Sequence, residues 1–331
     1  MVISFLTPVL SSASADEQLD GQDDEYDAQG IIIGDLADFD PADGREYLLI
    51  EEDTAVVSAY GFMKQAWIDS GRPGVDDMKY EPVTHGRASG RVCTPHLTGD
   101  ALTVPISGGS IDAYVAKTTN TVAFIVQTGR TLSSTVLNNL ASSWDSTIYP
   151  TMTTYYGKDY GDGRGLAAPD IDNNCQVQII VYDIDGAFNT GGYFAPSFAS
   201  VRESVFIDFA DITLNWGKSI IAHELQHLLH NAQDPYENLW IDEGNADVAI
   251  YLCIGPDSTL VSHLNQWTET PELSIRWWNQ RFADYGAGFI FTMYLADHLG
   301  GGPAVRQLVQ DSATGGVSVQ NLALSPPSGS S

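Results

Sequence analysis

Basic residues are scarce in this sequence. Only 15 Lys and Arg stand against 43 Asp and Glu in 331 residues, which gives a formal net charge of −28. Such a charge repels the phosphates of nucleic acids and the anionic headgroups of membranes. We therefore expect no nucleic-acid partner and no stable membrane insertion. The acidity alone is typical of a solvated surface and indicates no activity.

Cysteines and long apolar runs are also few. No segment after the N-terminus approaches the roughly 18 consecutive apolar residues of a membrane-spanning helix. The three cysteines are too few and too far apart for a disulfide framework or a zinc cluster. A bridge between Cys93 and Cys175 is compatible with the sequence but not determined by it, whereas Cys253, in the apolar run 248–254, is expected to be a buried thiol.

The N-terminus carries a pattern typical of secretion. Residues 1–15 are weakly apolar and end in Ala13-Ser14-Ala15, the small-x-small pattern of a signal-peptidase site. No Lys or Arg precedes this stretch, which departs from the usual basic start. The pattern predicts a signal peptide over 1–15 and a secreted, extracellular protein.

Composition divides the rest of the chain into three parts. Residues 16–109 begin as an acidic leader rich in Gln and Gly and continue with short apolar segments, which is compatible with a propeptide or a small N-terminal domain. Regular periodicity begins near residue 110, and we assign the main domain to 110–311. Residues 312–331, whose end contains only Pro, Gly and Ser, are expected to form a C-terminal tail or linker.

The periodicity of the main domain predicts an α+β fold. One helical face is expected where apolar residues recur every four positions from Leu132 to Ile148. Further helices are expected at about 217–232, from Asp242, and from Tyr285 to a stop at Gly300. The segments that predict strands are rich in β-branched residues or alternate in polarity: 121–126, 176–184 and 204–208.

The strongest chemical signal is His-Glu-Leu-Gln-His at residues 223–227. Residues four apart lie on one face of a helix, so His223 and His227 can reach one ion, and Glu224 is offset toward the position of a bound water. This spacing is typical of catalytic zinc. The alternative is an exposed helical face with two unrelated histidines, which the apolar flanks make less attractive.

A third ligand is expected downstream, because catalytic zinc takes three protein ligands and keeps one position open. Glu243 and Asp247 are again four residues apart. We predict Glu243 as the ligand and Asp247 as the outer carboxylate that accepts the second ring N–H of a histidine. The alternative is that both are solvated charges in the first turn of a helix.

These residues resemble the gluzincin metallopeptidases, the thermolysin-like clan. More narrowly, the chain over roughly 110–310 is similar to the hyicolysin-type neutral metallopeptidases. The segments that carry this similarity are Ile148-Tyr149-Pro150, Asp170-Ile171-Asp172, Val181–Ile184, Gly192-Tyr193-Phe194, Ala222–His227 and Asp284–Ala287. The resemblance implies a twisted sheet, a helix with the HExxH motif and a mainly helical C-terminal part.

The resemblance also implies zinc-dependent hydrolysis of internal peptide bonds, with Glu224 as general base and Glu243 as the third ligand. Gluzincins supply a Tyr or His that stabilises the oxyanion, for which Tyr285 is the first candidate here and His263 the reserve. Polypeptides are the expected substrates, and a monomer is expected. An exopeptidase on the same scaffold and a non-catalytic surface protein with a structural zinc remain alternatives.

The sequence offers three further candidate groups. His230 follows His227 by three residues and points about 60° away on a helix, so it is expected to be structural or partly exposed. A peptide substrate is expected to pair with a sheet edge, for which 204–208 is the candidate. Asp170, Asp172 and Asn174 begin like a calcium loop, but Cys175 and Val181 break the EF-hand pattern, so Ca²⁺ stays only an alternative cofactor.

Overall fold

The computed structural model describes residues 57–58, 60–69, 93–157, 170–187 and 189–327. In these residues a mixed β-sheet packs against helices, which confirms the α+β class. The expected signal peptide and the acidic part of the leader lie outside the described residues. No helix that the structure describes combines the length and the apolar character that crossing a bilayer requires.

The described strands form one seven-stranded sheet in the order β1-β6-β7-β5-β4-β3-β2. β4, β5 and β7 are parallel neighbours, β6 runs antiparallel to β7, and β2 and β3 extend the far side as an antiparallel hairpin. The sheet therefore includes residues before 110. The strand bounds are β1 Val57–Ser58, β2 Ala101–Ile106, β3 Gly109–Thr118, β4 Val122–Gln127, β5 Val177–Tyr182, β6 Thr190–Phe194 and β7 Ser204–Asp208.

One expectation about the sheet is wrong. Residues 204–208 do form a strand, β7, but β5 and β6 flank it on either side, so it offers no edge to a peptide. Its sequence is fully buried on both faces, as is usual for an inner strand. The strand at that side of the sheet is β6, and the two-residue strand β1 pairs with it in parallel.

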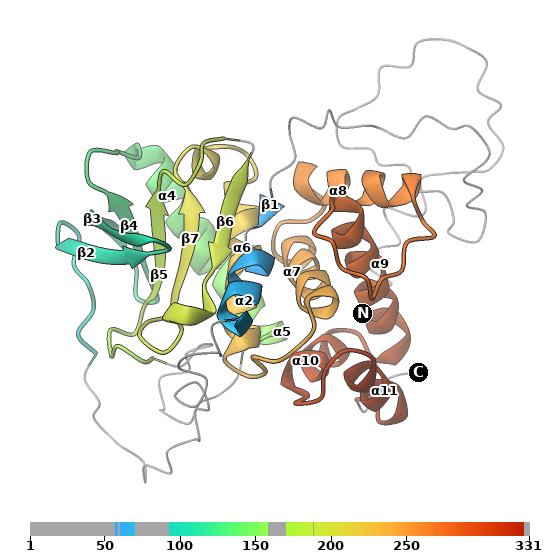
Figure 1. Ribbon diagram of the computed structural model, residues 1–331. Coiled ribbons are helices and arrows are strands. Elements are labelled where there is room, and N and C mark those ends of the chain that lie inside the picture. The colour runs from blue at the N-terminus through green and yellow to red at the C-terminus, as the bar shows by residue number, and fades with distance from the viewer. Residues whose placement is uncertain (1–56, 59, 70–92, 158–169, 188, 328–331) are drawn as a thin grey trace, which may run out of the picture.

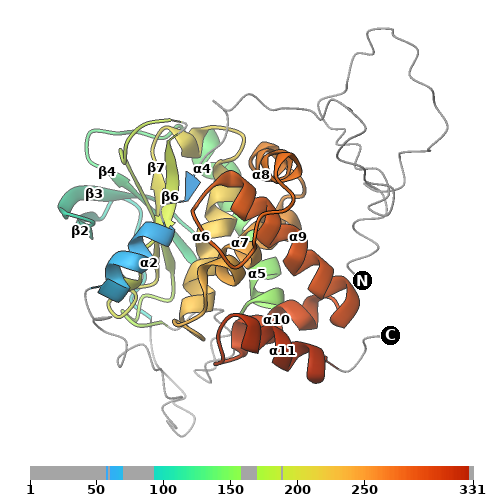
Figure 2. The same cartoon turned by 45° about the vertical axis from the view of Figure 1, so that its right-hand side comes forward.

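The helices lie mostly on one side of the sheet. In Figure 1 and Figure 2, α6 runs between the sheet and the helices that follow it in the chain. Gly300 ends α9 in a left-handed conformation, as its position in the sequence predicts. The helix bounds are α2 Tyr60–Asp69, α4 Ser134–Ser143, α5 Tyr149–Tyr155, α6 Gly217–Asn231, α7 Leu239–Cys253, α8 Ser258–Glu269, α9 Phe282–Leu299, α10 Gly302–Gln310 and α11 Gly316–Leu324.

The expected C-terminal tail contains a helix. α11 packs against α9 and α10, and Leu322 on it is fully buried. The prediction of a tail or linker from residue 312 therefore does not describe this stretch. Its short apolar pattern is too brief to be distinguished from a loop by periodicity.

The four-residue repeat between Leu132 and Ile148 has a structural explanation. A step of four residues overshoots one turn of an α-helix by about 40°, so a strict repeat drifts around the helix. Residues Trp144–Ile148 form a π-helical turn between α4 and α5, and its wider turn offsets the drift. Trp144 and Ile148 both stay buried in the core as a result.

The cysteines take the arrangement that the sequence left open. Cys93 and Cys175 form a disulfide, which ties the start of β5 to the segment before β2. Cys253, at the end of α7, is a buried free thiol, as expected. Burial raises the pKa of this thiol to about 12, so it stays protonated and inert at neutral pH.

Candidate metal centre

The helix α6 carries the HExxH motif through the middle of the molecule. Its apolar residues, among them Ile221, Leu225 and Leu229, are buried in the main core. His223, Glu224 and His227 are buried as well, at 4%, 1% and 0% exposure. Packing on both sides thus fixes the helix and with it the direction of these polar side chains.

Glu243 on α7 meets both histidines. Its Oε2 lies 3.1 Å from Nε2 of His223 and 3.2 Å from Nε2 of His227. The two helices that carry these residues are adjacent, and Glu243 is fully buried. The structure therefore brings together the three residues that the sequence predicts as ligands.

The other nitrogen of each imidazole faces a carboxylate. Nδ1 of His223 lies 3.2 Å from Asp247, and Nδ1 of His227 lies 3.1 Å from Asp242. Carboxylates accept hydrogen bonds, so Asp247 and Asp242 can each accept the Nδ1 proton of the histidine beside them when a metal takes the lone pair of Nε2. Asp247 thus stands where the sequence predicts the outer acid. Asp242 was missed, although it directly precedes Glu243.

This donor set fits zinc. Ligands at 2.0–2.2 Å from a tetrahedral ion lie about 3.3–3.6 Å from one another, close to the separations found here. Oε1 of Glu243 and Nε2 of His227 make no hydrogen bond with the described residues, as expected of groups reserved for an ion. His223, His227 and Glu243 are accordingly a group able to hold a metal.

Carboxylates dominate the charge of the centre. Burial disfavours a charged imidazole, but the hydrogen bonds that His223 makes to Asp247 and Glu243 raise its pKa well above the usual value. Burial likewise opposes ionisation of Asp242, yet Lys64, His230 and His227 hold its pKa well below the usual range. These shifts describe a centre that favours positive charge.

Tyr285 and His263 both lie beside the centre. The ring of Tyr285 is 6.2 Å from that of His223 and 4.8 Å from that of His263. Nδ1 of His263 lies 2.7 Å from Asp247, so this aspartate holds His263 together with His223. Burial, followed by the charges of nearby carboxylates including Glu243, raises the pKa of the Tyr285 phenol well above its ordinary value. The phenol is therefore a proton donor at neutral pH.

Close helix packing brings Tyr285 there. A Cβ atom at Gly244 on α7 would lie 2.6 Å from the carbonyl oxygen of Gly288 on α9. The two helices can approach so closely because both residues at the crossing, Gly244 and Gly288, lack a Cβ atom. Glu243 and Tyr285 stand next to this crossing.

The N-terminal helix α2 also reaches the centre, and nothing in the sequence indicated this. The ring of Tyr60 stacks on that of His227 at 3.7 Å, and its hydroxyl donates to Asp242 over 2.6 Å. The ammonium of Lys64, itself only 2% exposed, lies 2.6 Å from the same carboxylate oxygen. Figure 1 shows α2 in front of the space between β6 and α7.

One similar protein is a metalloprotease. The chain is 24% identical over 215 residues to the neutral metalloprotease ShpI of Staphylococcus hyicus, a match that covers 55% of this chain and 47% of the relative. The match thus spans about half of the relative's length. No family model matches the chain. The similarity supports a relationship to metallopeptidases, and the narrower hyicolysin-type assignment stays a prediction.

The candidate calcium residues are only partly together. Asp170 and Asp172 lie close to Glu203, which precedes β7. These three residues form a separate acidic group able to hold a metal. Asn174 instead donates its amide to Asp172 and accepts from the backbone of Gln176. Calcium at this loop stays an untested alternative.

Proposed function

We propose that the chain is a zinc-dependent endopeptidase that cleaves polypeptides. The observation that carries this proposal is the convergence of His223, His227 and Glu243, with Glu224 next to them on the same helix. The similarity to a metalloprotease supports it independently. When bound, zinc polarises the scissile carbonyl and lowers the pKa of water at the open position.

The protein's own residues then have distinct roles in the proposal. Glu224 accepts a proton from the attacking water and later delivers it to the leaving amine. Tyr285, protonated at neutral pH, donates a hydrogen bond to the oxyanion that develops on the substrate carbonyl. Asp242 and Asp247 hold the imidazoles in the orientation that presents Nε2. No covalent acyl-enzyme forms in this scheme.

β6, which only the two-residue strand β1 separates from the edge of the described sheet, is the proposed peptide-binding strand. Main-chain hydrogen bonds to an edge tolerate many side chains, which suits cleavage of varied polypeptides. In this structure β1 occupies that edge, with Val57 opposite Thr190 and Ser58 opposite Gly192. A substrate pairing with β6 at these positions must therefore replace β1.

This pairing favours the interpretation of the N-terminal part as a propeptide. With α2 in place, Glu224 and His227 are almost sealed from solvent.

We propose that the active, secreted form begins after residue 69, and the disulfide Cys93–Cys175 suits an oxidising extracellular compartment. N-terminal sequencing of active secreted material should give a start between 70 and 93. Active material that still contains Tyr60 would contradict removal of the segment.

Metal removal tests the proposed activity. A chelator should abolish hydrolysis of casein, and zinc added after removal of the chelator should restore it, because the proposed water activation requires the ion that His223, His227 and Glu243 would hold. Activity that persists in the chelator would contradict the proposal.

A peptide substrate with both ends blocked should still be cut by an endopeptidase. Cleavage of only unblocked peptides would favour the exopeptidase instead.

A further inference from the structure

A second cluster of metal-binding residue types lies at the end of α6. His230, Asp234 and Glu237 each offer one ligand atom, and these atoms lie within 4.8 Å of one another. The three residues are 0%, 3% and 1% exposed. None of them takes part in the proposed peptidase chemistry.

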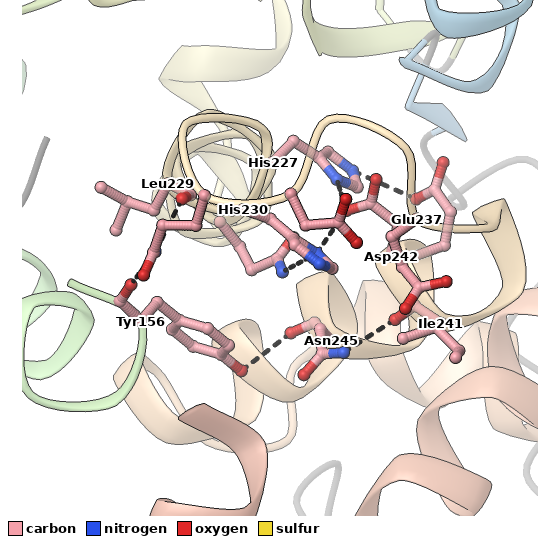
Figure 3. Close-up of polar contacts among 12 residues, drawn as sticks. Tyr156, His227, Leu229, His230, Glu237, Ile241, Asp242 and Asn245 are labelled. Carbon is pink, nitrogen blue, oxygen red and sulfur yellow. Dashed lines mark hydrogen bonds and ion pairs between the residues drawn. The ribbon is translucent and has the colours of Figure 1, made fainter. Parts of the chain in front are cut away.

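The orientation of His230 is that of a metal ligand. Figure 3 shows His227 and His230 directed from α6 toward Asp242, and Nδ1 of His230 lies 2.9 Å from Oδ1 of that residue. The amide of Gln226 lies 3.2 Å from the same nitrogen. A metal bound at Nε2 requires the proton to be on Nδ1, where Asp242 can accept it. Nε2 has no hydrogen-bond partner among the described residues.

The two carboxylates are held in place from outside the cluster. One oxygen of Asp234 accepts the backbone N–H of Tyr236, while Oδ2 has no hydrogen-bond partner in the described part of the chain. Glu237 accepts the backbone N–H groups of Asn238 and Gly315, each at 2.6 Å, and the hydroxyl of Ser318 at 2.9 Å. These bonds fix the carboxylates before any ligand arrives.

The charge of this cluster calls for a cation. Asp234 and Glu237 are both buried, and burial penalises the ionised form of a carboxylate. Lys64 approaches Asp242 rather than these two carboxylates at ion-pair distance. A buried carboxylate without a counter-charge is costly.

We propose that His230, Asp234 and Glu237 bind a second divalent cation of the zinc or manganese class. One imidazole nitrogen and two carboxylate oxygens suit such an ion, whereas calcium prefers oxygen ligands alone. Oδ1 of Asp242 serves both centres, at 3.1 Å from His227 and 2.9 Å from His230. The second site uses neither His223 nor Glu224, so it does not depend on the proposed function.

The number of zinc ions bound per chain tests the second site. Metal-free full-length protein is equilibrated with Zn²⁺, freed of unbound ion and measured by elemental analysis. The parent should hold two zinc ions per chain, Asp234→Asn and His223→Ala one each, and the double variant none. His298→Ala, which changes an exposed histidine, is the control and should hold two.

Several outcomes would overturn the proposal. One zinc per chain in the parent, lost completely in His223→Ala, would show that only the first centre binds metal. Two zinc ions in folded Asp234→Asn would exclude this aspartate as a ligand. If Asp234→Asn is unstable, the zinc content of His223→Ala still tests the proposal, because this variant should keep one zinc ion at the second site. Displacement of the second zinc by excess Ca²⁺ would contradict the assigned class of cation.

Discussion

Two His–carboxylate clusters take their histidines from the same helix, α6, and differ in which carboxylate each imidazole contacts. In the first, two imidazole nitrogens lie 3.1 and 3.2 Å from one oxygen of Glu243. In the second, the donors of His230, Asp234 and Glu237 lie within 4.8 Å of one another. His227 of the first cluster and His230 of the second both contact Asp242. In the first cluster the imidazoles thus contact a carboxylate of their own group, whereas His230 contacts Asp242, which is outside its own group.

The clusters also differ in how they connect to the rest of the fold. The first faces α7 and the Tyr285 end of α9, next to the covered edge of the sheet. The second is closed by the start of α11, through Gly315 and Ser318. In the proposed mechanism the first cluster has Tyr285 beside it as a donor for the transition state. The comparison predicts that changes in the first abolish activity.

Loss of Glu243 should have the largest effect. Glu243→Ala should remove one zinc ion per chain and all hydrolysis, because two histidines alone leave the charge and the geometry incomplete. Asp247→Ala is the matched control, since it removes only an outer partner and should weaken zinc affinity about 10- to 100-fold. Elemental analysis and a competing chelator measure the two effects. A zinc content in Glu243→Ala equal to that of the parent would exclude Glu243 as a ligand.

Loss of the Tyr285 hydroxyl should have a smaller effect. Tyr285→Phe should lower kcat about 10²- to 10³-fold and leave zinc content unchanged, because the hydroxyl acts only on the developing oxyanion. Steady-state kinetics on a blocked peptide measure this change. Turnover at the parent rate would remove Tyr285 from the mechanism, and His263, with its Nε2 unpartnered among the described residues, would be the next residue to test.

Much of the fold could be predicted where the signal is local. The bounds of α6 and β7 follow from continuous apolar patterns, and the HExxH spacing places His223, Glu224 and His227 on one helix. The start of α7 lies at Leu239 instead of Asp242, because the apolar residues before Asp242 are also helical. Helix ends are poorly marked when no capping side chain is present.

The rest depends on contacts between distant segments. The sheet order decides that β7 is an inner strand between β5 and β6, and strand sequences alone do not encode that order. Tyr60 and Lys64 reach Asp242 across more than 170 residues of chain, without any motif to mark them. His230, expected to be structural or partly exposed, is fully buried, because α7 and the segment after α6 cover it.

The most direct test of the central claim is the substitution Glu224→Gln. The amide keeps the size of the side chain but cannot accept the proton of water, so zinc content should match that of the parent while casein hydrolysis falls about 10²- to 10⁴-fold. Glu269→Gln, at an exposed glutamate on α8, is the control and should keep full activity. Hydrolysis by folded, zinc-loaded Glu224→Gln at the parent rate would contradict the account.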